Sequence, residues 1–263
     1  MTDFSKKIKN KHVTGLELDV SDDVLTVRLD REKKRNSITY DMYDAITEAL
    51  KMAESEDDIR AVLFSASGSI FSAGHDVGGF TRGLDLAYDE KPSYSFMQTL
   101  SRFPKLVVAA VNGDAVGVGA TLLLHCDLVY AVPDCRIIFP FIKMGLVPEF
   151  ASTYYLPQLI GYSKAMSLFL REGGCTAEQA VEWGIFNETI PRTQLRDYVA
   201  DVLKELVKLS PDAVMQTKRL AKMTTKELVQ TTIAEEAQVF HELLGSDFVR
   251  GRLETIQQKI SGK

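Results

Sequence analysis

Two short segments, residues 61–65 and 106–111, consist almost entirely of apolar residues, and they constrain the fold more than any other feature. Segments of this length and composition are typical of strands that are buried on both faces, as in a parallel sheet covered by helices. Residues 41–53, by contrast, have apolar residues at helical spacing. Strands and helices therefore alternate along the first two thirds of the chain, which predicts an α/β core.

Other segments fit the same scheme. Residues 16–20 and 24–29 alternate apolar and polar residues across a short polar turn, which predicts a β-hairpin. Residues 128–132 and 136–139 are predicted to be two further strands around a Pro-Asp turn. Beyond Tyr162 the pattern becomes helical, and five helices are predicted there: residues 165–170, 177–183, 195–209, 211–223 and 226–244.

Residues 81–95 show no clear period and mix charged, glycine, proline and aromatic residues. A long irregular stretch of this kind often covers a ligand, but it is equally typical of an exposed loop. The sequence leaves both interpretations open.

The composition excludes several functional classes. A formal net charge of −5 gives no basic surface for nucleic acid or an anionic membrane. The chain has an odd and sparse set of three cysteines, which argues against a disulfide scaffold and favours the cytoplasm. The longest apolar run, residues 106–110, is too short to cross a bilayer. We therefore expect a cytoplasmic protein with neither a membrane nor a nucleic-acid partner.

Two glycine-containing segments, residues 72–77 and 112–119, follow strand-like runs. Glycine lets the backbone bend sharply and lets a ligand approach the amides. Two such turns that face each other can direct two N–H groups at one oxygen atom, which is the arrangement of an oxyanion hole. The second turn also precedes a helical pattern, whose N-terminus would polarise a carbonyl further. The sequence therefore predicts carbonyl chemistry, with an enolate as a candidate intermediate.

Glu149 lies in an otherwise apolar stretch, residues 145–152, which opens a predicted helix. On the residues alone, an acid in the first turn that is stabilised by the helix dipole is the better interpretation. A role in catalysis is the alternative, and the motifs described below favour it.

The histidines carry less information. His75 lies inside the first glycine turn and could contact a ligand. His125 lies near Cys126 and Cys135, but the spacing does not match a pair of metal ligands, so we expect no metal site and a packing role for His125. His241 stands alone and is expected at the surface.

At these residues the chain resembles the crotonase superfamily, that is, the enoyl-CoA hydratase/isomerase superfamily. The similarity lies in four ordered motifs that span nearly the whole chain, within residues 30–37, 71–76, 111–127 and 175–185. The resemblance implies a spiral of ββα units over residues 1–200 and a helical trimerisation region over residues 201–263. It also implies an acyl-CoA thioester as substrate, a homotrimer or hexamer, and no cofactor besides the coenzyme A of the substrate.

The resemblance also implies site residues. The backbone amides of His75 and Val118 would form the oxyanion hole, and Lys33, Lys34 and Arg35 would meet the nucleotide of coenzyme A. The remaining residues expected to line the substrate and coenzyme A path are Ser72, Ala73, Gly74, Asp76, Val77, Gly117 and Phe141.

The departures from the family pattern bear on the activity. Hydratases of the family carry two glutamates, at positions that hold Thr121 and Phe141 in this chain. Glu149 follows Pro148 at the position where Δ3,Δ2-enoyl-CoA isomerases of the peroxisomal type carry one catalytic glutamate, and where related dehalogenases carry an aspartate. The resemblance therefore implies an isomerase of β-oxidation with Glu149 as its single acid and base. The alternatives are a hydratase or hydrolase that uses a different group, and a catalytically silent acyl-CoA-binding subunit.

Overall fold

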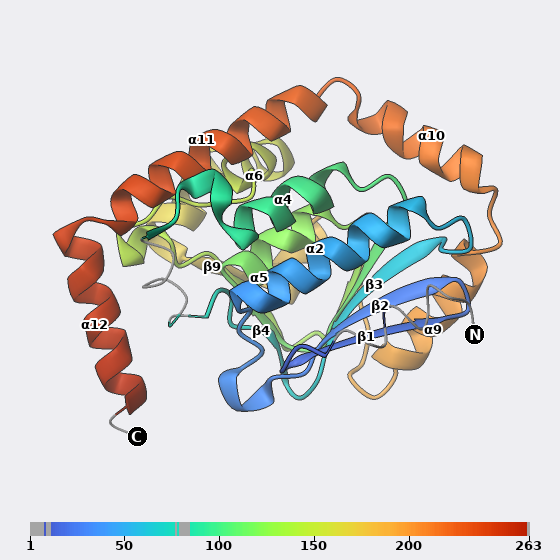
Figure 1. The fold of residues 1–263 in the computed structure, drawn as a ribbon, viewed down its shortest axis with the longest axis horizontal. Coiled ribbons are helices and arrows are strands. Elements are labelled where there is room, and N and C mark those ends of the chain that lie inside the picture. Colours follow the sequence, from blue (N-terminus) through green and yellow to red (C-terminus); the bar gives the residue numbers. More distant parts are fainter. Residues whose placement is uncertain (1–7, 9–11, 77, 79–84, 262–263) are drawn as a thin grey trace.

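The structure is a computed structural model that describes residues 8, 12–76, 78 and 85–261. Its larger sheet has six strands in the order β1 (Leu16–Ser21), β2 (Val24–Leu29), β3 (Ala61–Ala66), β5 (Leu106–Val111), β7 (Leu128–Ala131) and β10 (Glu188–Thr189). β1 and β2 pair antiparallel, and every other neighbouring pair of this sheet is parallel. The predicted hairpin and the predicted buried parallel strands are confirmed (Figure 1).

The smaller sheet has the order β4 (Ile70–Ser72), β6 (Asp114–Val116), β8 (Arg136–Ile138) and β9 (Gly174–Thr176). β6 pairs parallel with both β4 and β8, whereas β9 pairs antiparallel with β8. The two strands predicted around the Pro-Asp turn exist, but β7 belongs to the larger sheet and β8 to the smaller one. Because β4 and β6 run parallel side by side, the two glycine turns that follow them leave the same end of this sheet.

The α-helices are α2 (Tyr40–Ser55), α4 (Pro92–Arg102), α5 (Val118–Thr121), α6 (Ser152–Ile160), α7 (Tyr162–Ser167), α8 (Ala177–Glu182), α9 (Leu195–Leu206), α10 (Pro211–Lys222), α11 (Lys226–Leu244) and α12 (Asp247–Ser261). Shorter helical turns are η1 (Glu32–Lys34), η3 (Tyr88–Glu90), η4 (Leu122–His125), η5 (Ile142–Met144) and η6 (Leu168–Glu172). Residues 81–95, which were expected to be irregular, are helical in part, because they include η3 and the start of α4. Residues 81–84 lie outside the described residues.

The helices cover the larger sheet in layers. α2 and α4 lie side by side over it, and α11 crosses outside α4 (Figure 1). The apolar face of α2, including Met42, Ile46 and Leu50, is buried. α9 packs against β5 and β7. None of the helices in the described part of the chain is both long and apolar enough to cross a lipid bilayer.

Candidate active site

The two glycine turns are in direct contact. Gly74 has a φ of +89°, and a Cβ atom at this position would lie 2.7 Å from the carbonyl oxygen of Val116. A Cβ atom at Gly119 would lie 2.7 Å from Cβ of Ser72. Side chains at either glycine would therefore push the turns apart, so glycine is required at both positions for this close approach.

Gly117 is needed for a different reason. Its backbone has φ 56° and ψ −124°, a conformation that is open essentially to glycine alone. A Cβ atom here would meet only Cα of Gly74, at 3.9 Å, so the constraint comes from the backbone and not from a steric clash. Gly117 caps α5, and Val118 is therefore the first residue of the helix, where an N–H group has no acceptor within the helix.

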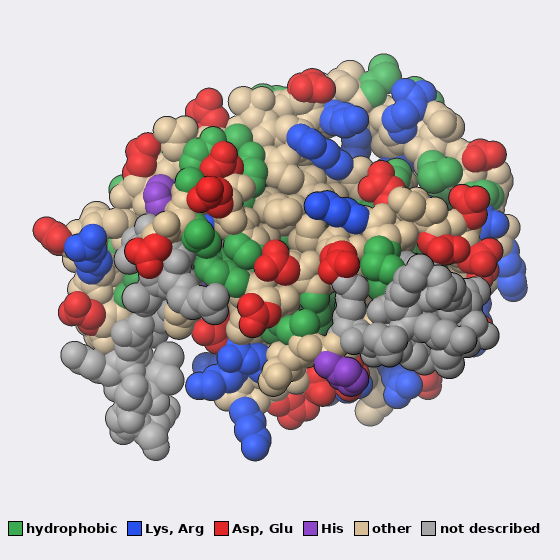
Figure 2. All heavy atoms as spheres, in the orientation of Figure 1, with side chains coloured by type: hydrophobic (Ala, Val, Ile, Leu, Met, Phe, Trp, Pro, Cys, Tyr) green, Lys and Arg blue, Asp and Glu red, His purple; other side chains and the backbone are tan. Residues whose placement is uncertain are grey.

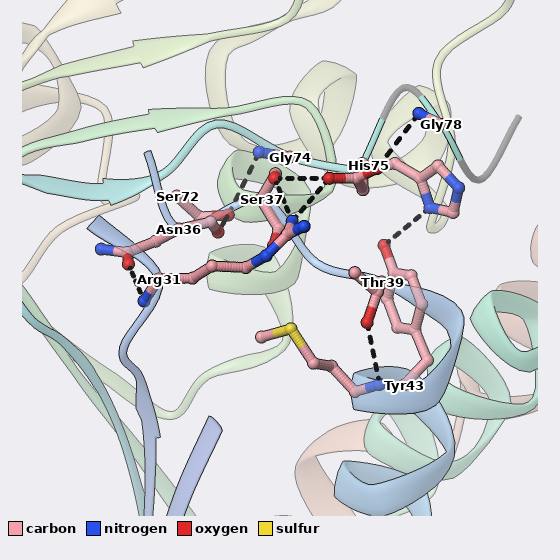
Figure 3. A network of polar contacts seen from close by, with 11 residues as sticks. Arg31, Asn36, Ser37, Thr39, Tyr43, Ser72, Gly74, His75 and Gly78 are labelled. Carbon is pink, nitrogen blue, oxygen red and sulfur yellow. Dashed lines mark hydrogen bonds and ion pairs between the residues drawn. The ribbon is translucent and has the colours of Figure 1, made fainter. Parts of the chain in front are cut away.

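The side chain of Asp76 holds the first turn in place. Its carboxylate accepts hydrogen bonds from Arg31 Nη1 at 2.5 Å, from the Ser37 hydroxyl at 3.1 Å and from the Gly78 amide at 3.1 Å. Figure 3 shows this network, which joins the loop after β2 to the turn after β4. Val77, which was expected to line the substrate path, lies outside the described residues.

Like Asp76, Ser72 has a structural role in the first turn. It is fully buried, its hydroxyl donates to the Asn36 carbonyl at 2.9 Å, and it accepts the Gly74 amide at 3.1 Å. The amide of Ala73 donates to the carbonyl of Arg35 at 2.8 Å. These three contacts fix the backbone of residues 72–74, immediately before His75.

The imidazole of His75 lies against two tyrosines of α2. Its ring is stacked on Tyr43 with centroids 5.6 Å apart, and the centroid of Tyr40 is 5.1 Å away. Its Nδ1 atom is 3.4 Å from the Tyr43 hydroxyl (Figure 3). Burial is the main cause that lowers the pKa of His75 to about 4, so the ring is neutral at pH 7.

The three basic residues expected to meet the nucleotide lie elsewhere on the surface. Lys33, Lys34 and Arg35 are exposed, on and just after η1. Figure 2 shows Lys and Arg side chains gathered at the lower left, where Figure 1 places this loop. None of the three lines the cavity described next.

A cavity of about 190 Å³ opens in front of the two turns. Gly74, His75, Gly117, Val118 and Glu149 all line it, so the structure brings the residues whose amides are the predicted donors and the predicted acid to one cavity. Its apolar walls include Met97, Phe141, Leu146, Ile233, Phe240 and Leu244. Among the described lining residues the only carboxylate belongs to Glu149, and residues 79–84 contain neither Asp nor Glu.

Glu149 itself is half-buried at the wall of this cavity. Burial is the main cause that raises its pKa to about 8, and the negative charge of Glu236 raises it further. The interpretation as a first-turn acid is wrong, because α6 begins only at Ser152 and is capped by Ala151. Phe150 and Ala151 have φ values of 62° and 54°, so a left-handed turn separates the acid from the helix.

Glu236 of α11, and not Glu149, is the acid at the N-terminus of α6. Its carboxylate accepts the Ala151 amide at 2.6 Å, the Thr153 amide at 3.0 Å and the Thr153 hydroxyl at 2.5 Å. Burial raises the pKa of Glu236 to about 7. The sequence analysis missed this residue, although its spacing from Ile233 and Phe240 places it on the apolar face of a helix, where an acid is unusual.

His125 fixes the other side of the same turn. Its Nε2 atom donates to the Phe150 carbonyl at 2.8 Å, and the two rings stack with centroids 3.9 Å apart. Burial lowers the pKa of His125 to about 3, so it is a neutral donor. The predicted packing role is confirmed. The described residues contain no cluster suited to a metal ion, and the thiols of Cys126 and Cys135 are free.

This architecture is similar to that of known proteins. The model of the enoyl-CoA hydratase/isomerase family matches residues 19–258. The structure of OdaA from Pseudomonas aeruginosa superimposes with a TM-score of 0.88 and 36% identity, over 93% of this chain and 99% of that chain. An enoyl-CoA hydratase/isomerase from Pseudoalteromonas atlantica T6c gives a TM-score of 0.87 at 32% identity, over 94% and 98% of the two chains. The expected crotonase-type fold is confirmed.

Two relatives are similar in sequence at the same level. Enoyl-CoA delta isomerase 2 of Rattus norvegicus is 34% identical over 218 residues, which are 81% of this chain but only 56% of the rat protein. The chain thus spans little more than half the length of that relative. The 1,2-epoxyphenylacetyl-CoA isomerase of Escherichia coli (strain K12) is 34% identical over 189 residues, 70% of this chain and 72% of that protein. By sequence motifs, fold and overall similarity, the chain belongs to the enoyl-CoA hydratase/isomerase family.

Proposed function

We propose that the protein is a Δ3,Δ2-enoyl-CoA isomerase that uses Glu149 as its single acid and base. The observation that carries the proposal is the cavity itself, which Glu149, the one carboxylate among the described lining residues, lines together with the two glycine turns. The name of the rat relative, a delta isomerase, agrees with this activity.

The reaction needs one base and one oxyanion site. The C2 protons of a 3-enoyl thioester are acidified by the carbonyl and by the double bond. Ionised Glu149 removes one of them, and the two amides stabilise the negative charge that forms on the thioester oxygen. The protonated Glu149 then returns the proton to C4, so the double bond moves to C2 with no net change in atoms.

A hydratase is less well supported, although Alternaria alternata ACTT3, an enoyl-CoA hydratase, is 29% identical over 88% of this chain and 79% of its own length. Hydration needs groups for both the attacking water and the C2 proton. Thr121 is fully buried, and Phe141 lines the cavity as an apolar wall. A silent acyl-CoA-binding subunit would gain nothing from a carboxylate kept in a site that raises its pKa.

Turnover of 3-enoyl-CoA and 2-enoyl-CoA, measured side by side, tests the proposal. We expect the 3-enoyl thioester to be isomerised and the 2-enoyl thioester to be hydrated poorly. Brisk hydration would favour the hydratase, and no turnover of either thioester would favour the silent subunit.

We further propose a homotrimer or hexamer that acts on acyl-CoA thioesters of β-oxidation in the cytoplasm. Lys33, Lys34 and Arg35 would bind the phosphates of coenzyme A, for which their exposed charges are suited. Asp76 and Ser72 would contribute by holding the turn that the pantetheine passes. None of the three cysteines, all of which lie in the described part of the chain, forms a disulfide, which agrees with a reducing compartment.

The pH dependence of kcat/KM should reveal the pKa of Glu149, the proposed base. Because Glu149 must be ionised to accept a proton and its pKa is raised to about 8, kcat/KM should rise with pH and level off above about 8. Glu236→Gln removes a neighbouring negative charge, so it should lower the pKa of Glu149 and move this rise to lower pH. The exposed neighbour Glu235 offers the control, since Glu235→Gln should leave the profile unchanged. An unshifted profile in Glu236→Gln would contradict the coupling.

His75→Ala should keep most of the activity. The proposed donor is the backbone amide of residue 75, which the substitution retains, so kcat should stay within about tenfold of the wild-type value. Steady-state kinetics and the affinity for free coenzyme A would be measured together. Complete loss of activity with unchanged affinity would instead make the imidazole a catalytic group.

A further inference from the structure

The cavity wall contains a buried lysine that the proposed reaction does not use. Lys91, immediately before α4, is 8% exposed and lines the cavity together with Glu149. It is the one Lys or Arg among the described lining residues. A buried ammonium group is costly unless acceptors replace its water, so the surroundings of Lys91 should account for it.

Two other lysines of this chain show how such burial is normally compensated. Lys105 donates to two backbone carbonyl oxygens, each at 2.6 Å. Lys218 donates to the Asp127 carboxylate at 2.6 Å. Lys91 differs from both, because its side-chain hydrogen-bond partner among the described residues is a nitrogen, Nδ1 of His241, at 2.8 Å. An ammonium group has three N–H donors, and this contact uses one of them.

Among the described residues, the charges around Lys91 do not include a compensating carboxylate. Burial lowers the pKa of Lys91, and no acid raises it. Asp89 and Glu90 are exposed, and the Glu90 carboxylate accepts the backbone amide of Ala87, the residue before η3, at 3.2 Å. Burial, together with the charge of Lys91, lowers the pKa of His241, against an opposing effect of Glu242. His241 is thus a neutral acceptor. It is partly exposed, as expected for a surface residue, but it does not stand alone, because it contacts Lys91.

The position of Lys91 in the cavity indicates that it would contact the acyl group of the substrate and not the phosphates of coenzyme A. The basic residues on and after η1 are outside the cavity, where they can meet phosphates without help from Lys91. Inside, the wall formed by α4 and α11 is apolar at Met97, Ile233 and Phe240. An acyl chain whose thioester oxygen lies at the two amides would run along apolar surface and meet Lys91, the one Lys or Arg among the described lining residues. Such a surface suits an acyl chain that is apolar along its length and negatively charged at its end.

We propose, building on the isomerase function above, that the acyl group of the substrate ends in a carboxylate, which Lys91 binds while His241 holds the ammonium group in place. Lys91 and His241 thus form a specificity site for dicarboxylic monothioesters of coenzyme A. The carboxylate supplies the oxygen acceptors that Lys105 and Lys218 find within the protein.

Saturated thioesters test this site without any turnover. Calorimetry would compare pairs of acyl-CoA thioesters of equal chain length, one ending in a methyl group and the other in a carboxylate. We expect the wild-type protein to bind the carboxylate-ended member at least about tenfold more tightly, as for a charge-assisted hydrogen bond. Equal affinities, or a preference for the methyl end, would overturn the proposal. Failure of the isomerase function would appear separately, as binding with this preference but no isomerisation of the matching 3-enoyl thioesters.

Lys91→Met keeps the length of the side chain and removes its charge. The variant should lose the preference for the carboxylate end while its affinity for free coenzyme A stays unchanged, and Lys91→Arg should keep part of the preference. Lys143→Met, at an exposed lysine of η5, is the matched control. A preference that survives Lys91→Met would make Lys91 a structural tie between α4 and α11, and equal weakening of every ligand would place it against coenzyme A. Either result overturns the proposal. If the Lys91→Met variant does not fold, the comparison of the paired thioesters with the wild-type protein decides whether the proposal holds.

Discussion

Glu149→Gln is expected to lower kcat for isomerisation by at least about a hundredfold, the lower range for the loss of a general acid and base. Glutamine has the same size and lines the same cavity, but it cannot take up the C2 proton. KM should change little, because the amides of the two glycine turns and the basic residues near η1 remain. Kinetics with a 3-enoyl-CoA substrate would measure both constants.

Exchange of C2 deuterons with solvent gives an independent reading of the same step. The variant should lose this exchange with an unreactive acyl-CoA analogue, whereas Glu178→Gln, at an exposed position of α8, should keep it. Isomerisation by Glu149→Gln at close to the wild-type rate would refute the proposed mechanism.

Gly74→Ala is expected to lower kcat/KM by about a hundredfold, the effect of losing one oxyanion donor. Alanine is strained at a φ of +89°, and its Cβ atom would approach the Val116 carbonyl to 2.7 Å. That carbonyl is part of the opposite turn, so the turns must separate and the His75 amide must move away from the Val118 amide. Steady-state kinetics would measure the loss.

Gly161→Ala is the matched control for this substitution. Gly161 has a φ of +80°, but a Cβ atom there would meet nothing within 4 Å. Both variants should therefore lose stability in thermal unfolding from backbone strain, whereas only Gly74→Ala should lose activity. Equal activity of the two variants would show that contact between the turns is not required for catalysis.

The sequence predicted those parts of the fold whose patterns are local. Strands buried on both faces, such as β3 and β5, are marked by their uninterrupted apolar composition. The glycine turns were recognisable because their conformations exclude other residues. The separation of β7 and β8 into different sheets could not be predicted in this way, because strand pairing depends on distant segments.

The residues of the candidate site whose roles the sequence did not predict were missed for one common reason. Glu236 and His241 lie on α11, more than eighty residues after Glu149. Their partners, the N-terminus of α6 and Lys91, become neighbours only through the packing of α11 on α4 and α6. An acid on the apolar face of a predicted helix was the one local signal of such a contact.

The placement of α11 also has a consequence for how the protein is made. Every strand of both sheets ends by residue 189, whereas α11 begins at Lys226. Since domains form from the N-terminus during synthesis, a nascent chain can complete its sheets on the ribosome before Ile233 and Phe240 exist to close the cavity. Glu236, which caps α6 beside Glu149, also emerges late. The proposed active site is thus completed only once α11 has been synthesised, after both sheets, and isomerase activity would report that synthesis has passed α11.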